Sequence, residues 1–237
     1  FFRCWCDPMG VYTIADLHLS LDGKKPMDVF PGWNDYVSRL TKNWNALVTP
    51  QDTVVIAGDI SWAMKLEDAD LDFAYLDRLP GKKLLLKGNH DYWWSTRKKI
   101  EAYLTNRGFS TLSIVHNSAV PVGEIAVCGT RGWLYNAETP EDQKIVNREV
   151  GRLTTSLKEA ESPGLRPVVF LHYPPLYDDQ RCEEILNVLK EWNIRDCYFG
   201  HIHGSQAAKR AVVGEYSGIK MHLISCDTVQ FTPVLVR

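Results

Sequence analysis

Two hydrophobic periods alternate along the first half of the chain. Short apolar runs bounded by turn residues are typical of buried strands, whereas apolar residues three and four positions apart are typical of amphipathic helices. This pattern predicts strands over 11–15, 53–57 and 83–87 and helices over 34–48, 67–79 and 95–106. Because strands and helices alternate, we expect a parallel sheet with right-handed crossover connections.

The pattern changes after residue 108, where short β-rich runs are separated by turn dipeptides. Runs at 109–115, 119–122 and 124–129 predict antiparallel strands of a second sheet. Further helices are predicted over 141–160 and 181–192, further strands over 167–171 and 196–199, and strand-like runs at 221–225 and 229–236 are expected to complete the second sheet. No linker divides the chain, so we expect residues 9–237 to form one domain and residues 1–8 to be an N-terminal extension.

Polar side chains that can bind a metal follow five of the predicted strands. In chain order they are Asp16, His18, Asp59, Asn89, His90, Asp91, His172, His201 and His203. Residues two apart on an extended strand point the same way, so each Asp-x-His or His-x-His pair can face one point in space. Gly88-Asn89 alone is also an ordinary turn dipeptide. The recurrence of such residues at successive strand ends indicates a metal site, whereas His116 and His222 are expected to be surface or core histidines.

Composition limits the classes of function. Apolar residues make up 45% and charged residues 24% of the chain, which is typical of a globular protein with a sizeable core. The formal net charge of -2 gives no overall attraction to nucleic acid or to an anionic membrane, and no apolar run is long enough to span a bilayer. The six cysteines form no Cys-x-x-Cys pair. We therefore expect reduced thiols and a cytoplasmic protein.

The order of motifs carries a family resemblance. Asp16-Leu17-His18, Gly58-Asp59, Gly88-Asn89-His90-Asp91, His172 and Gly200-His201-Ile202-His203 together resemble the calcineurin-like metallophosphoesterase superfamily, and in particular its bacterial predicted phosphohydrolases, over residues 11 to about 231. The resemblance implies an α/β (α+β) fold, namely a four-layer αββα sandwich of two mixed β-sheets packed face to face and flanked by helices.

The resemblance also implies a dinuclear metal centre in which Asp59 bridges two ions. One ion would be held by Asp16, His18, Asp59 and His203, and the other by Asp59, Asn89, His172 and His201. Imidazole together with carboxylate suits divalent Mn, Fe, Zn or Ni better than Mg or Ca, which favour shells of oxygen alone.

The implied activity is phosphoric ester hydrolysis, in which a metal-bound hydroxide attacks a phosphodiester or a small phosphorylated metabolite. His90 would stabilise the transition state or protonate the leaving alkoxide, and Asp91 is expected to orient the His90 ring. In the protein phosphatases of the superfamily the second motif continues to an Asp-Arg pair that grips phosphate, whereas this chain reads Gly58-Asp59-Ile60-Ser61-Trp62 with no arginine, which disfavours that substrate class. A nuclease and a non-catalytic metal-binding scaffold remain alternatives.

Several residues beside the motifs are candidates for binding substrate. Arg131 follows a predicted strand and either contacts the substrate phosphate or is an ordinary surface arginine. The aromatic candidates, which either stack on a base or sugar or pack the loops together, are Trp62, Trp93, Trp94 and Tyr173. The expected partner is a small phosphoester, with no nucleic acid and no membrane. The sequence leaves the oligomeric state open.

Overall fold

The computed structural model of the chain describes residues 9–133, 138–161 and 164–237. Its first sheet has the strand order β13-β1-β2-β3-β4. Four strands run parallel, and they are β1 (Val11–Ile14), β2 (Thr53–Ala57), β3 (Lys82–Leu86) and β4 (Leu112–Ile114). At one edge, β13 (Val234–Leu235) pairs antiparallel with β1. The predicted extension over residues 1–8, with Cys4 and Cys6, lies outside the described residues.

The second sheet has the strand order β11-β12-β10-β7-β6-β5. Its parallel strands are β12 (Ile219–Leu223), β10 (Asp196–Phe199), β7 (Arg166–Leu171) and β6 (Ile125–Thr130). The edge strands β11 (Gly214–Tyr216) and β5 (Val120–Val122) pair antiparallel with their neighbours. A separate short hairpin consists of β8 (Leu176–Tyr177) and β9 (Gln180–Arg181).

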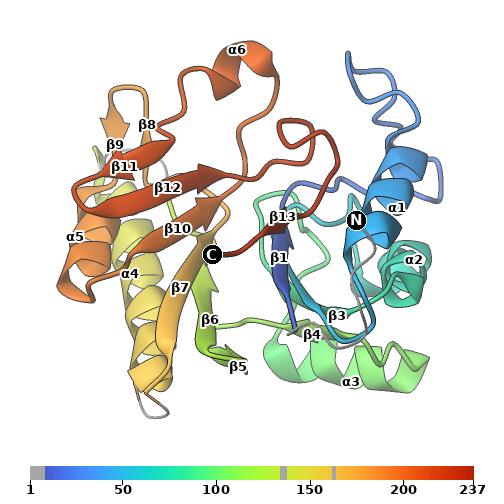
Figure 1. Cartoon of the computed structure of the whole chain (residues 1–237), viewed down its shortest axis with the longest axis horizontal. Coiled ribbons are helices and arrows are strands. Elements are labelled where there is room, and N and C mark those ends of the chain that lie inside the picture. The colour runs from blue at the N-terminus through green and yellow to red at the C-terminus, as the bar shows by residue number, and fades with distance from the viewer. Residues whose placement is uncertain (1–8, 134–137, 162–163) are drawn as a thin grey trace.

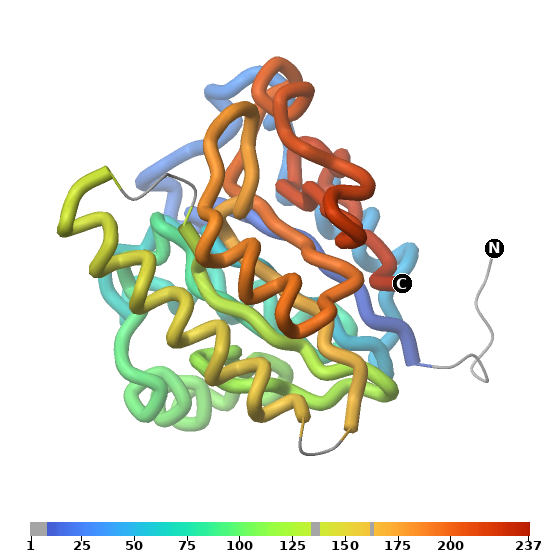
Figure 2. Tube along the Cα trace, turned by 90° about the vertical axis from the view of Figure 1, so that its left-hand side faces the viewer, coloured from blue at the N-terminus to red at the C-terminus, as the bar shows by residue number. Residues whose placement is uncertain are grey.

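Helices cover the outer face of each sheet, as the two views show (Figures 1 and 2). The first sheet carries α1 (Tyr36–Leu47), the 3-10 helix η1 (Leu66–Ala69), α2 (Asp70–Arg78) and α3 (Arg97–Arg107). The second carries α4 (Pro140–Glu161) and α5 (Glu183–Glu191), and the short α6 (Ser205–Ala208) follows β10. Apolar helix residues such as Trp44 and Phe73 pack on the first sheet, and Leu153 and Leu186 pack on the second.

A third apolar core lies between the two sheets. Val55 and Leu84 of the first sheet pack in the same cluster as Val168, Phe170 and Tyr198 of the second. The neighbouring residues Val54 and Ile56 belong instead to the core under the helices, because side chains alternate along a strand. Both faces of β2 are therefore buried, and the predicted four-layer αββα arrangement is confirmed.

Two strand assignments from the sequence were wrong. The run at 109–115 forms β4, which pairs parallel with β3 in the first sheet rather than antiparallel in the second. The run at 229–236 contributes only β13, which also joins the first sheet, beside β1. β4 continues the first sheet after α3, and β13 returns to it from the second sheet. Hydrophobic periodicity carries no information about which sheet a short strand joins.

Two further expectations from the sequence were reduced cysteine thiols and the absence of a membrane-spanning segment. The four described cysteines, Cys128, Cys182, Cys197 and Cys226, are buried free thiols. Burial raises the pKa of Cys182 to about 11 and that of Cys128 to about 12, so both remain protonated at neutral pH. Among the described residues, no helix combines the length and apolar character needed to cross a membrane.

Candidate metal centre

The candidate ligands come together because parallel strands of both sheets end on the same side of the molecule. Asp16 and His18 follow β1, Asp59 follows β2, and Asn89 follows β3 in the first sheet. His172 follows β7, and His201 and His203 follow β10 in the second sheet. Residues remote in sequence are joined directly, since the backbone N–H of His201 donates to Asp16 Oδ2 at 2.9 Å. The centre therefore lies across the junction of the two sheets.

Two groups of donor atoms form within this junction. Asp16, His18 and His203 make one group and Asp59, His172 and His201 the other, with the donor atoms of each group within 4.8 Å of one another. Asp59 Oδ2 lies 3.7 Å from His18 Nε2 and 3.5 Å from His172 Nε2. Asp59 therefore belongs to the second group and also lies close to His18 of the first group, which is the position expected for a bridging ligand.

The orientation of the rings suits cation binding. His172 Nδ1 lies 3.3 Å from the carbonyl oxygen of Ala57, and His203 Nδ1 lies 3.0 Å from Asp227 Oδ1. When Nδ1–H donates to these oxygens, the lone pair on Nε2 points into the centre. His172 Nε2 then faces the amide oxygen Oδ1 of Asn89 at 2.6 Å. Two lone pairs this close repel, and a cation bound to both atoms would remove that repulsion.

The electrostatics of the buried groups also fit a cation. Burial raises the pKa of Asp16 to about 6, and burial followed by the charges of Asp16 and Asp91 raises the pKa of Asp59 to about 9. Burial likewise lowers the pKa of His201 to about 4 and those of His18 and His172 well below their usual value. These three imidazoles are therefore in the neutral form that binds metals, whereas the charges of Asp16 and Asp227 raise the pKa of His203.

The backbone is strained at these positions. Asp16, His18, Asp59 and His201 have positive φ angles of 60°, 45°, 50° and 73°. Side chains with a Cβ rarely adopt this left-handed region, and such strain concentrates at functional sites. The glycines beside the ligands leave no spare room, because a Cβ on Gly88 would overlap the Asp59 carboxylate and one on Gly200 would overlap that of Asp16. The loops are shaped to aim the ligands inward.

His90 lies next to the centre without joining either donor group. Its backbone N–H donates to Asp59 Oδ1 at 2.7 Å, and its ring lies 4.6 Å from that of Trp62 and 5.7 Å from that of His18. Ring nitrogen Nδ1 lies 3.2 Å from the hydroxyl of Tyr92. Burial lowers the pKa of His90, and the nearby positive charges of Lys25 and His203 lower it further.

Asp91 does not hold the His90 ring, contrary to the expectation from the sequence. Its carboxylate is 1% exposed and accepts hydrogen bonds from the backbone N–H of Gly88 at 2.7 Å and of Ile60 at 2.8 Å. It also accepts from Trp93 Nε1 at 3.0 Å. Because these donors lie on the loops after β2 and β3, Asp91 ties the two ligand-bearing loops together. Tyr92 takes the place beside His90 that Asp91 was expected to have.

The candidate substrate residues lie in three different places. Trp93 is 2% exposed and packs edge-on against Phe73 with ring centroids 4.9 Å apart, so its prediction as a substrate contact was wrong. The half-buried Trp62 stacks on His18 at 4.9 Å, and Tyr173 lies 4.4 Å from His201. Trp94 and Arg131 are further from the donor groups and line a neighbouring pocket.

Sequence reasoning missed two residues at the centre. Asp227 contacts His203, as described above, and Trp33 places its ring 5.7 Å from that of His203 and 6.0 Å from that of His18. Asp227 follows a predicted strand over 221–225, so its place at a strand end was the available signal. His222 is structural as expected, since it contacts Asp196 at 3.0 Å and stacks on Tyr198.

Comparisons with known proteins agree with this geometry. A family profile described as calcineurin-like phosphoesterase matches residues 9–205. No curated protein matches the chain.

Solved structures show similarity over almost the whole chain. Phosphopantetheinyl hydrolase from Mycobacterium tuberculosis shares 14% identity, covers 96% of this chain and 95% of that chain, and has a TM-score of 0.56. A protein of Thermus thermophilus shares 13% identity, covers 97% and 98%, and has a TM-score of 0.60. A protein of unknown function from Aquifex aeolicus shares 16% identity, covers 96% of each chain and has a TM-score of 0.52. At these identities the similarity shows a shared fold.

Proposed function

The chain belongs to the calcineurin-like phosphoesterase family, and from that premise we propose that it hydrolyses a phosphodiester or a small phosphorylated metabolite at a dinuclear metal centre. The observation that carries the proposal is the position of Asp59 between two groups of donor atoms, with Oδ2 3.7 Å from His18 Nε2 and 3.5 Å from His172 Nε2. A single-ion site would need only one of these groups.

We assign seven residues as ligands. One ion would be held by Asp16, His18, Asp59 and His203, and the other by Asp59, Asn89, His172 and His201. Divalent Mn, Fe, Zn or Ni fits this mixture of imidazole and carboxylate. When bound, two such cations would neutralise the phosphoryl oxygens and activate a water for in-line attack on phosphorus.

The chain's own residues supply positioning and proton transfer. His90 is held beside the centre by its backbone hydrogen bond to Asp59 and by the contact of its ring with Tyr92. As the bond from phosphorus to the leaving oxygen breaks, a proton on the His90 ring passes to that oxygen. Trp62 packs against the rings of His18 and His90 and limits the access of bulk water from that side.

The alternative functions have less support. Among the described residues all seven expected ligands converge, which disfavours a non-catalytic scaffold that has lost its ligands. Asp59 is followed by Ile60, Ser61 and Trp62, without the Asp-Arg pair of the protein phosphatases, which disfavours a protein substrate. A nuclease is disfavoured by the net charge of -2, since non-specific binding of nucleic acid depends on clustered cations.

Two variants test the proposal. His90→Ala should keep both ions, measured by elemental analysis, while kcat for an alkyl ester with a poor leaving group falls by roughly 100-fold or more. Asp59→Asn should lose metal itself, and His222→Ala, which changes a histidine remote from the centre, should keep both metal and kcat. Full activity of His90→Ala on the poor leaving group would contradict the role of His90.

A further inference from the structure

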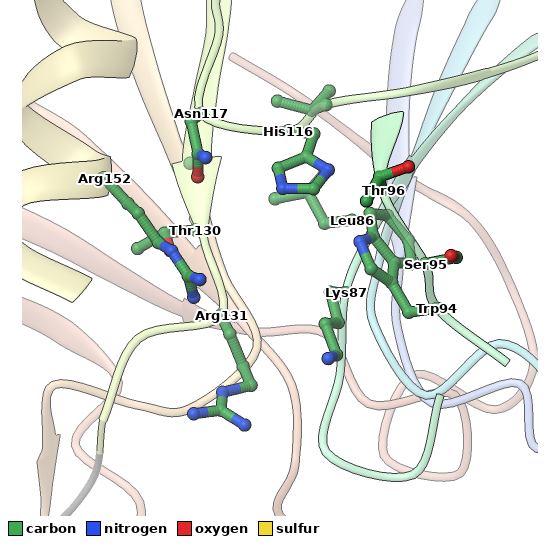
Figure 3. Close-up of a pocket in the computed structure, with 12 residues that line it drawn as sticks. Leu86, Lys87, Trp94, Ser95, Thr96, His116, Asn117, Thr130, Arg131 and Arg152 are labelled. Carbon is green, nitrogen blue, oxygen red and sulfur yellow. The ribbon is translucent and has the colours of Figure 1, made fainter. Parts of the chain in front are cut away.

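A second pocket lies beside the metal centre, at the carboxyl ends of β3 and β6. Its volume is about 400 Å³. Side chains enter it from both halves of the fold, with Arg131 and Arg152 on one side and Lys87 and Trp94 on the other (Figure 3). The described residues that line it are Leu86, Lys87, Trp94, Ser95, Thr96, Val115, His116, Asn117, Gly129, Thr130, Arg131 and Arg152.

The lining is strongly cationic. Lys87, Arg131 and Arg152 carry positive charge, and no carboxylate is among the described lining residues. The nearest compensating group is the fully buried Glu149, whose Oε1 lies 2.7 Å from a guanidinium nitrogen of Arg152 and 3.9 Å from one of Arg131. Its other oxygen accepts from Thr130 Oγ1 at 2.5 Å. Glu149 thus faces the two arginines, and the charges of Asp91 and Glu149 both favour the charged form of Lys87. Three cations against these two buried carboxylates leave the pocket with excess positive charge.

Polar atoms in the pocket also lack partners. In the described part of the chain, Arg131 Nε and His116 Nδ1 are buried and form no hydrogen bond. A buried donor without a partner costs roughly 1–3 kcal/mol. Burial lowers the pKa of His116, and the positive charges of Arg152, Arg97 and Lys87 lower it further, while Glu101 acts weakly in the opposite direction. Arg131 Nε is a donor in every protonation state, and an anion in the pocket would offer it an acceptor and relieve the repulsion among the cations.

The pocket shares its wall with the metal centre. The carbonyl oxygen of Arg131 accepts hydrogen bonds from the backbone N–H of His172 at 3.1 Å and of Tyr173 at 2.8 Å. The guanidinium carbon of Arg131 lies 5.9 Å from the ring of Tyr173, and that ring lies 4.4 Å from the ring of His201. Tyr173 therefore separates Arg131 from the second donor group by the width of one aromatic side chain.

We propose that this pocket binds a second phosphate group of the substrate while the scissile phosphate ester occupies the metal centre. The substrate class is accordingly a small phosphate ester that carries a further phosphate one spacer away. Guanidinium groups bind phosphate through paired hydrogen bonds, and Arg131 and Arg152 present two of them toward one cavity. Trp94, Leu86 and Val115 give the pocket an apolar wall. This inference rests on the proposed hydrolytic function, although binding to the pocket is testable without turnover.

Binding is tested with inorganic phosphate on the zinc-loaded protein, using the His116 ring proton as a local NMR signal. Phosphate should shift this signal saturably in the wild type. Arg152→Gln should weaken phosphate binding and raise the apparent Kd by roughly tenfold or more. Ser95→Asp, which adds a negative charge to the lining and leaves the contact between Arg152 and Glu149 in place, should weaken it similarly even if Arg152→Gln folds poorly. Arg148→Gln, an exposed arginine one turn away on α4, is the matched control and should bind like the wild type.

Substrate selection is tested with p-nitrophenyl alkyl phosphodiesters whose alkyl chain ends in either a phosphate or a hydroxyl, over several chain lengths. For at least one length, the wild type should favour the phosphate-terminated ester by roughly tenfold in kcat/KM. Arg152→Gln should abolish this preference, and Arg148→Gln should preserve it.

The outcomes separate the two hypotheses. Absence of a saturable His116 shift in the wild type, or an unchanged Kd in both Arg152→Gln and Ser95→Asp, overturns the pocket assignment. Hydrolysis of both esters without preference at any length overturns its role in substrate binding, even if inorganic phosphate binds there. Failure to hydrolyse either ester with any metal contradicts the proposed function, and the NMR titration then decides the anion site separately.

Discussion

Asp227 Oδ1 lies 3.0 Å from Nδ1 of His203, and the second oxygen of the same carboxylate accepts the backbone N–H of Gly204 at 2.7 Å. Burial by itself lowers the pKa of His203, but the charges of Asp16 and Asp227 together raise it. A carboxylate in this position fixes the tautomer and the direction of a histidine ring that binds metal. Asp227 therefore acts as a positioning residue for the first donor group.

Replacing Asp227 with Asn should weaken metal binding by roughly 10- to 100-fold, because the amide has no charge and only one acceptor oxygen for the two donors, His203 Nδ1–H and Gly204 N–H. Isothermal titration calorimetry with Zn²⁺ or Mn²⁺ measures the change. Asp178→Asn, an exposed aspartate that pairs with Arg210, is the control and should bind metal like the wild type. Equal affinities for both variants would show that Asp227 does not position His203.

Replacing Asp91 with Asn should lower the free energy of unfolding by roughly 1–3 kcal/mol. An amide offers one acceptor where the carboxylate offers two, so one of the N–H groups of Gly88, Ile60 and Trp93 loses its partner. Urea unfolding measures the loss, with Asp28→Asn on an exposed loop as the control. A variant as stable as the wild type would contradict the role of Asp91 in joining the two loops.

Trp93 should contribute to stability and Tyr92 should not. Trp93→Ala removes a ring that is 2% exposed, at an expected cost of about 3–5 kcal/mol in the free energy of unfolding. Tyr92 is 50% exposed, so Tyr92→Ala should change stability by less than about 0.5 kcal/mol while lowering kcat through its contact with His90. Chemical unfolding and a turnover assay on both variants distinguish these effects, and the reverse pattern would refute the assignment.

Lys83 should give the protein a characteristic pH dependence. Its ammonium is buried, donates to the carbonyl oxygens of Leu79 and Gly81, and has a pKa lowered by burial from 10.5 to about 8. Between these pH values Lys83 is protonated in the unfolded chain and largely neutral in the folded protein, so the free energy of unfolding rises as pH increases from about 8 to 10.5. Below about pH 8 both states are protonated, and the full cost of burying the charged ammonium lowers the stability.

The variant Lys83→Met should therefore flatten the rise in Tm between about pH 8 and 10 relative to the wild type. Lys82→Met is the matched control, because Lys82 is the exposed neighbour on the same strand. If Lys83→Met and Lys82→Met give the same slope as the wild type, Lys83 does not titrate as its burial requires.

The sequence predicted most of the first sheet because each of its long strands is a continuous apolar run. Val54, Val55, Ile56 and Ala57 are all fully buried, as such a run implies for a strand covered on both faces. The partners of short strands were not predictable. β4 has three residues and β13 has two, so neither offers enough periodicity to identify its neighbour, and only long-range packing determines the sheet that each joins.

At the site, the sequence predicted residue types better than contacts. The seven candidate ligands all lie at strand ends whose register places them together, whereas Asp91 and Trp93 were assigned by adjacency to His90 and are buried in structural roles. Asp227 was missed because an isolated aspartate forms no motif. Asp227 and His203 are 24 residues apart in the sequence, and a local sequence pattern cannot predict a contact over that separation.

The central claim is that two divalent ions, joined by Asp59, support phosphoester hydrolysis. The most direct measurement is elemental analysis of the purified protein combined with turnover of a chromogenic phosphodiester before chelation, after chelation and after each metal is restored. We predict two ions per chain before chelation. Removal of both ions by the chelator should abolish turnover, and turnover should recover only when metal is restored. One ion per chain at full activity, or no turnover with any metal, would contradict the account.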